Sequence, residues 1–225
     1  MNMNKLALAC GVAMLGLSSV AAADVSMNIG ATSNYIWRGL TQTNNDSAIS
    51  GGLDYSHASG FYLGTWASSA SWAPGMTYEL DLYGGFAGEY NGFGYDASIL
   101  RYSYDKDVNA DFTELGLSGS WQFLSAGLNY TFSADNSDQE GDMYYYAGVS
   151  FDLPQDFSIG GTVGHYNFDD SSLEDYSHYQ IDLTKSAGDF GDVTLTLSDT
   201  NLKDTDPAAG GDSDPRFLVS WSKTF

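Results

Sequence analysis

Residues 76–83 read MTYELDLY, and this stretch decides the fold class. Apolar and polar side chains alternate along it, so an extended chain would place Leu80 and Leu82 on one face and Glu79 and Asp81 on the other. An α-helix would instead spread the same residues over all of its faces. The stretch is therefore predicted to be a β-strand with one apolar and one polar face.

The same period of two recurs along the chain, and counting such segments predicts twelve strands. They cover residues 24–40, 47–58, 60–69, 76–90, 93–104, 111–121, 123–133, 142–153, 156–168, 175–186, 189–199 and 215–225. Connections after even-numbered strands are short, as at Asn91-Gly92, whereas those after odd-numbered strands are long, as at residues 200–214. Long and short loops on opposite rims are typical of an outer-membrane barrel, with both termini on the periplasmic side.

A soluble β-sandwich also alternates and also has glycine-rich turns, so it is the main alternative fold. Carboxylates in the middle of strands, opposite faces that are wholly apolar, favour a wet lumen and a lipid-facing exterior instead. Aromatic residues near predicted strand ends are expected to form the interfacial girdles, among them Tyr35, Trp37, Trp121 and Phe123. The sequence thus predicts an all-β transmembrane antiparallel barrel of about twelve strands.

The two ends of the chain support this location. Residues 1–23 have the basic start, the apolar run and the small residues before Asp24 that are typical of a secretory signal peptide, which leaves 24–225 as the barrel. The last segment places Phe217, Val219, Trp221 and Phe225 on one face. Such a terminal aromatic strand resembles the sorting signal that the barrel-assembly machinery reads, so we expect the outer membrane of a Gram-negative bacterium.

Composition excludes other classes of function. The chain has 29 acidic residues against 8 Lys and Arg, a formal charge of −21, and so has no basic patch for nucleic acid. No apolar stretch after Ala23 is long enough for a transmembrane helix. The acidic residues concentrate in the long loops, where they could meet lipopolysaccharide phosphates through Mg²⁺ or Ca²⁺. No loop fits a dedicated calcium motif, so a solvated acidic surface is the default and neither a metal site nor a cofactor is expected.

Three segments near the start of the mature chain carry a resemblance to a known family. They are residues 34–43 (NYIWRGLTQT), 48–55 (AISGGLDY) and 59–68 (SGFYLGTWAS). The sequence resembles the Gcw_chp family, the TorF-type porins of proteobacteria, over roughly its first three strands and in its terminal Phe225. The resemblance implies an outer-membrane barrel of unassigned solute and supplies no catalytic residues.

Phasing each strand by its apolar face predicts which polar side chains line the pore. The predicted pore-lining residues are Arg38, Asp54, Glu79, Asp81, Glu114, Asn129, Asp182 and Asp192. Carboxylates dominate this set, and a narrow channel focuses their field, so the lining predicts a preference for cations. Arg38 is the main inward base, while Arg101 stays ambiguous because residues 93–104 can be phased either way.

Two functions follow from this lining. The first is a porin-like channel for passive passage of small hydrophilic solutes. The second is a non-conducting structural or adhesive barrel, because small barrels fill with side chains and only wide ones leave water. A barrel hydrolase would need a histidine held against a nucleophile, but phasing places His165 and His178 on opposite faces of the wall. We therefore expect no enzyme.

Overall fold

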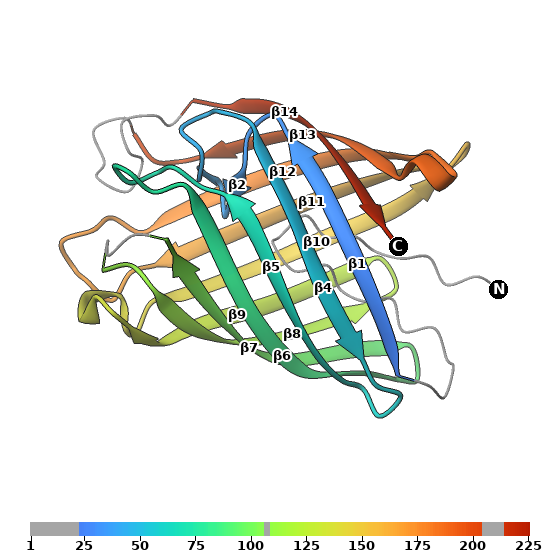
Figure 1. Ribbon diagram of the computed structural model, residues 1–225, viewed down its shortest axis with the longest axis horizontal. Helices are drawn as coiled ribbons and strands as arrows, with labels where there is room; N and C mark the ends of the chain where they lie inside the picture. Colours follow the sequence, from blue (N-terminus) through green and yellow to red (C-terminus); the bar gives the residue numbers. More distant parts are fainter. Residues whose placement is uncertain (1–22, 106–108, 204–213) are drawn as a thin grey trace.

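In the described part of the chain, twelve strands form a closed antiparallel barrel (Figure 1). The structure is a computed structural model that describes residues 23–105, 109–203 and 214–225. The predicted signal peptide, residues 1–23, lies outside this part except for its last residue. The barrel strands are β1 (Asp24–Thr32), β4 (Ala48–Ser56), β5 (Phe61–Ser69), β6 (Tyr78–Tyr90), β7 (Phe93–Tyr104), β8 (Phe112–Trp121), β9 (Leu124–Ala134), β10 (Met143–Leu153), β11 (Phe157–Asn167), β12 (Tyr176–Ser186), β13 (Asp192–Thr200) and β14 (Arg216–Thr224).

The order of the strands confirms the predicted barrel. Each barrel strand pairs with the barrel strands before and after it in the chain, and β1 pairs with β14 to close the ring. Two short 3₁₀ turns, η1 (Ser137–Gln139) and η2 (Gly188–Phe190), interrupt the connections. Among the described residues, no helix is long and apolar enough to cross a membrane.

The two rims differ as the loop lengths predict. The short turns lie at one rim, where Asn91 and Gly92 take left-handed φ values of 50° and 80° in a two-residue hairpin loop. The start of β1 lies at this rim too, because Asp24 pairs with Ser56 just before a short turn. The end of β14 joins it there, since Phe225 exchanges backbone hydrogen bonds with Met27. Both ends of the barrel therefore share the rim of the short turns.

The predicted alternation is seen on the two faces of the wall. On β6, Leu80 and Leu82 are exposed on the outer face, whereas Glu79 and Asp81 are buried on the inner one. Inward glycines leave room for inward rings: a Cβ on Gly64 would lie 2.5 Å from the Tyr83 ring. The barrel thus presents apolar side chains to lipid and fills much of its interior with polar and aromatic ones.

The first predicted strand, residues 24–40, is wrong beyond Thr32. The chain leaves the wall there, and residues 33–47 form a small hairpin of β2 (Ile36–Trp37) and β3 (Leu40–Thr41), which we call the inner hairpin. Its turn is Arg38-Gly39, and both residues have left-handed φ, 48° and 87°, which a regular strand does not allow. The prediction extended too far because β2 is itself extended, so its residues continue the alternation of the preceding strand.

A matched pair of substitutions on β14 should separate the two faces. Val219 is 47 % exposed on the lipid side, and the next residue, Ser220, points inward. Val219→Arg should lower the free energy of unfolding by about 2 to 4 kcal/mol, the cost of a cation on the lipid face near the bilayer middle. Ser220→Arg should lower it much less. Urea unfolding in lipid vesicles measures both, and equal losses would contradict the assignment of faces.

Candidate functional site: the lumen and its inner hairpin

The inner hairpin lies inside the ring, near the rim of the long loops (Figure 1). Its residues contact side chains on β5, β6, β7, β8, β10, β11, β12 and β14. Strands on all sides of the barrel therefore meet this one segment. The hairpin narrows the lumen at its level.

Arg38, at the tip of the inner hairpin, is the centre of this packing. Its two terminal nitrogens donate to the two carboxylate oxygens of Glu114 on β8, at 2.7 and 2.6 Å. Its guanidinium carbon lies 4.2 Å from the ring centre of Trp37 and 4.3 Å from that of Tyr144. Both ends of the ion pair are buried. A bidentate pair between stacked rings fixes the hairpin tip in one position.

Other contacts hold the hairpin on its two sides. The Tyr35 hydroxyl donates to Glu79 Oε1 at 2.9 Å. From β14, Arg216 donates to Asn45 Oδ1 at 3.1 Å and to the Gly39 carbonyl oxygen at 3.5 Å. Glycine is required at position 39, because a Cβ there would lie 2.5 Å from the His178 Cβ. Tyr35 and Trp37 are thus lumen residues, and their prediction as interfacial girdle residues is wrong.

Five of the inward carboxylates gather on one side of the barrel. We call this set the acidic wall; it lies on β4 to β8 and consists of Asp54, Glu79, Asp81, Asp96 and Glu114. Asp54 accepts hydrogen bonds from Asn28, at 3.2 Å, and from the Tyr83 hydroxyl. Asp96 accepts one from Tyr62 at 2.7 Å. In the described part of the lumen, Arg38 and Arg216 are the buried arginines whose positive charges oppose these negative charges.

The remaining residues predicted to line the pore lie on the other strands. Asn129 on β9 and Asp182 on β12 are half-buried and point inward. Asp182 accepts hydrogen bonds from Gln180, at 2.9 and 3.1 Å, and from Thr196 at 2.6 Å. Asp192 is the first residue of β13 and lies near the rim of the short turns, opposite Ser222. The sequence placed Arg38 on a strand, whereas the structure places it on the inner hairpin.

The structure settles the phase of β7, which the sequence left open. Tyr95, Ile99 and Arg101 point outward, and Arg101 forms an ion pair with Asp111 at 3.0 Å on the outer side. Arg101 is therefore not a lumen base. The same phase brings Asp96 into the lumen, which sequence reasoning missed. It also missed Arg216, although the outward alternation of Phe217, Val219 and Trp221 implied that Arg216 faces inward.

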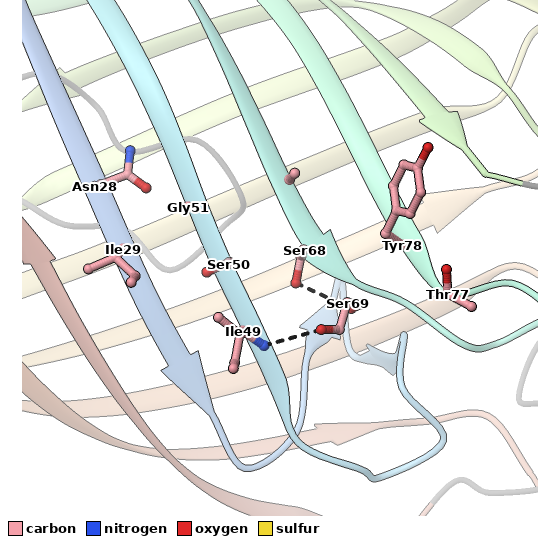
Figure 2. A pocket seen from close by; sticks show the side chains of 10 residues that line it. Asn28, Ile29, Ile49, Ser50, Gly51, Ser68, Ser69, Thr77 and Tyr78 are labelled. Carbon is pink, nitrogen blue, oxygen red and sulfur yellow. Dashed lines mark hydrogen bonds between the residues drawn. The ribbon is translucent and has the colours of Figure 1, made fainter.

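A hollow of about 460 Å³ lies across β1, β4, β5 and β6, near the long-loop end of these strands (Figure 2). Its lining includes inward Asn28 and outward Ile29 and Tyr78, and the strands stay paired across it. Figure 2 shows Ser69 at its centre, where the hydroxyl accepts from the Ile49 backbone N–H at 3.4 Å. None of the acidic-wall residues lines the hollow.

The histidines take the opposite faces that their phases predict. His165 points outward, with its Nδ1 2.9 Å from the Ser177 hydroxyl and its ring 5.5 Å from that of Tyr145. His178 points inward, with its Nε2 2.9 Å from the Tyr144 hydroxyl. The wall of the barrel separates the two rings, so they do not form a pair.

The long loops carry the acidic rim that the sequence predicts, in so far as they are described. Burial raises the pKa of Asp142, just before β10, while hydrogen bonds from the Asp169 N–H at 2.8 Å and the Tyr166 hydroxyl at 3.1 Å oppose that shift. In the described ranges, no group of three acidic, histidine or cysteine side chains is placed to hold a metal ion. Contact with lipopolysaccharide through divalent cations stays a prediction.

Several outer-membrane channels of known structure share this fold. A KdgM porin superposes with a TM-score of 0.59 at 11 % identity, covering 89 % of this chain and 99 % of that chain. A KdgM porin in complex with disordered oligogalacturonate gives 0.59 at 10 % identity, covering 91 % and 99 %. The COG4313 outer membrane channel from Pseudomonas putida F1 gives 0.55 at 11 % identity, covering 93 % and 97 %. These matches are to channels and porins, and none of the three is an enzyme.

At the level of sequence, no curated protein matches this chain. A family model does match, and it covers residues 18–225, which include the whole barrel. The chain therefore belongs to the Gcw_chp family, which is described as a bacterial protein of unknown function.

Proposed function

We propose that the protein is an outer-membrane channel through which small hydrophilic solutes pass passively, with a preference for cations. The observation that carries this proposal is the acidic wall. Its five carboxylates lie on one side of the lumen. Arg38 neutralises Glu114, which leaves the negative charge with Asp54, Glu79, Asp81 and Asp96.

Electrostatics gives the direction of the preference. Low-dielectric walls focus the field of fixed charges into a pore, so inward carboxylates raise the local concentration of cations and lower that of anions. The shared fold with outer-membrane channels supports passage through the lumen. One of those channels was solved with oligogalacturonate, a polyanion. The acidic wall disfavours a polyanion here, so the solute class should differ.

The inner hairpin supports a second candidate function. It contacts strands on all sides of the lumen, and its Arg38 is buried in an ion pair. If the hairpin closes the lumen completely, the protein is a structural or adhesive barrel that displays acidic loops. Single-channel recording in planar bilayers separates the two functions: discrete conductance steps support the channel, and silence supports the closed barrel.

Neutralising two carboxylates of the acidic wall tests the cation preference. In a KCl gradient, the reversal potential of the wild type should favour K⁺, and Glu79→Gln with Asp81→Asn should shift it toward Cl⁻. The difference should be larger in dilute salt, because the screening length falls from ~10 Å at 0.1 M to ~3 Å at 1 M. Asp189→Asn, on a short periplasmic turn, is the control and should leave the potential unchanged. Anion selectivity of the wild type would refute the proposal.

A further inference from the structure

The charges around the inner hairpin do not balance. Glu79, Asp81 and Glu114 are 1 %, 2 % and 1 % exposed, so water screens none of them. Arg38 neutralises Glu114 in a bidentate pair. Arg101 pairs with Asp111 and Lys185 with Asp156, both remote from this place. Glu79 and Asp81 therefore have no cationic partner among the described residues.

Asp81 is the less satisfied of the two carboxylates. Glu79 accepts a hydrogen bond from Tyr35, whereas Asp81 Oδ1 is buried without any hydrogen-bond partner. A buried carboxylate that is neither paired nor hydrogen-bonded costs several kcal/mol. A proton, a water molecule or a bound cation can complement Asp81.

The neighbours of Asp81 indicate which cation would fit. In the register of the sheet, Asp81 lies between Trp66 on β5 and Tyr102 on β7, and all three side chains point inward. Directly opposed residues on neighbouring strands have Cβ atoms about 4.5–5.5 Å apart, so both aromatic side chains start beside that of Asp81. The Tyr102 ring then stacks on Phe112, with 4.3 Å between the ring centres. Tyr35 covers the site from the inner hairpin, with its ring 5.6 Å from that of Trp66.

A single carboxylate with aromatic residues as its neighbours in the sheet suits an organic ammonium better than a metal ion. Hard metal ions take several oxygen ligands at once, and among the described residues no such group of three is present. An ammonium group needs an anion to receive its N–H bonds and gains further from aromatic rings around it.

We propose that Asp81, whose neighbours in the sheet are Trp66 and Tyr102, binds the ammonium group of the permeating solute. This inference rests on the proposed function and names its substrate class: small hydrophilic molecules that carry an alkylammonium group. Glu79 adds a second negative charge beside the site, and the inner hairpin, through Tyr35, forms its roof.

Calorimetric titration of the full barrel in detergent with n-propylammonium chloride tests the site. Ionic strength is held constant with KCl, so that only specific binding is measured. The wild type should bind, and Asp81→Asn should weaken binding by about tenfold or more, which is 1.4 kcal/mol. Asp81→Glu, which keeps the charge, should retain measurable binding.

Asp182→Asn is the matched control. Asp182 is also an inward carboxylate, but Gln180 and Thr196 already donate to it. Its loss should leave propylammonium binding unchanged. The proposal would be overturned if the wild type did not bind propylammonium at neutral pH, which is the result expected if a proton complements Asp81. It would also be overturned if Asp81→Asn bound propylammonium as well as the wild type. The heat-modifiable shift on gels identifies any variant that fails to fold. If Asp81→Asn does not fold, the binding of propylammonium by Asp81→Glu tests the proposal, and loss of that binding in a folded Asp81→Glu variant would overturn it.

The titration does not depend on conduction, so the two proposals can fail separately. A channel that selects K⁺ over Cl⁻ but does not bind propylammonium would overturn the ammonium site alone. A barrel that binds propylammonium and stays silent in bilayers would overturn passage and leave the site in place.

Discussion

Replacing Arg38 by Ala should release the inner hairpin and raise the single-channel conductance several-fold. The substitution leaves Glu114, which is 1 % exposed, as a buried charge without its partner. Breaking such a pair on one side costs about 3 to 5 kcal/mol. The packing of the guanidinium between Trp37 and Tyr144 is lost as well. Water that solvates the Glu114 carboxylate relieves this cost. Water reaches the carboxylate only when the hairpin tip moves away, so the substitution favours a displaced hairpin.

Two variants make this prediction specific. Arg101→Ala removes an ion pair of the same chemistry on the outer side, where the arginine side chain is 44 % exposed, and should leave conductance unchanged. Arg38→Ala combined with Glu114→Gln removes both charges, so it should recover part of the lost stability without recovering the closed position of the hairpin. Planar-bilayer recording and urea unfolding measure the two effects. Unchanged conductance in Arg38→Ala would show that the hairpin is held without its ion pair.

Replacing Trp221 and Phe225 together by Asp should prevent assembly in the outer membrane. Trp221 points outward on β14, and Phe225, the residue after the end of that strand, is 62 % exposed. A charged side chain on the lipid face costs up to about 2 to 4 kcal/mol for Arg or Lys at the midplane, and less for Asp and near the rim, so the two Asp substitutions act together. The last strand also closes the ring, because Phe225 donates to and accepts from the Met27 backbone. We expect the variant to lack the heat-modifiable band of folded barrel in outer-membrane fractions.

The control for this variant lies on the same strand. Ser220 and Ser222 point inward between the outward positions, so Ser220→Asp with Ser222→Asp adds the same charges to the lumen side. This control should assemble. Normal accumulation of the Trp221 and Phe225 variant would contradict the role of the terminal aromatic face.

The barrel could be predicted from the sequence because its signals are local. The period of two in a segment such as residues 76–83 assigns both faces of a strand at once, and the parity of loop lengths orders the strands into a ring. The inward positions of Glu79, Asp81 and Glu114 follow from that alternation alone.

The inner hairpin could not be predicted in the same way. Tyr35 and Trp37 continue the alternation of β1, and the signal against a strand was the Arg38-Gly39 turn, whose meaning depends on partners far away in the chain. Glu114 and Tyr144, which hold Arg38, are brought to it only by closure of the ring. The phase of β7 was ambiguous for a related reason: Leu100, Tyr102 and Tyr104 are apolar or aromatic and yet point inward, because they pack around the hairpin.

The place of the inner hairpin in the chain sets the order of events during folding. The hairpin follows β1 directly, whereas the seam that encloses it joins β1 to β14, the first barrel strand to the last. Contacts between such distant segments form late, because long loops must close before they are made. The hairpin, which follows β1 directly, is therefore expected to pack among β5 to β12 before β14 arrives and closes the seam.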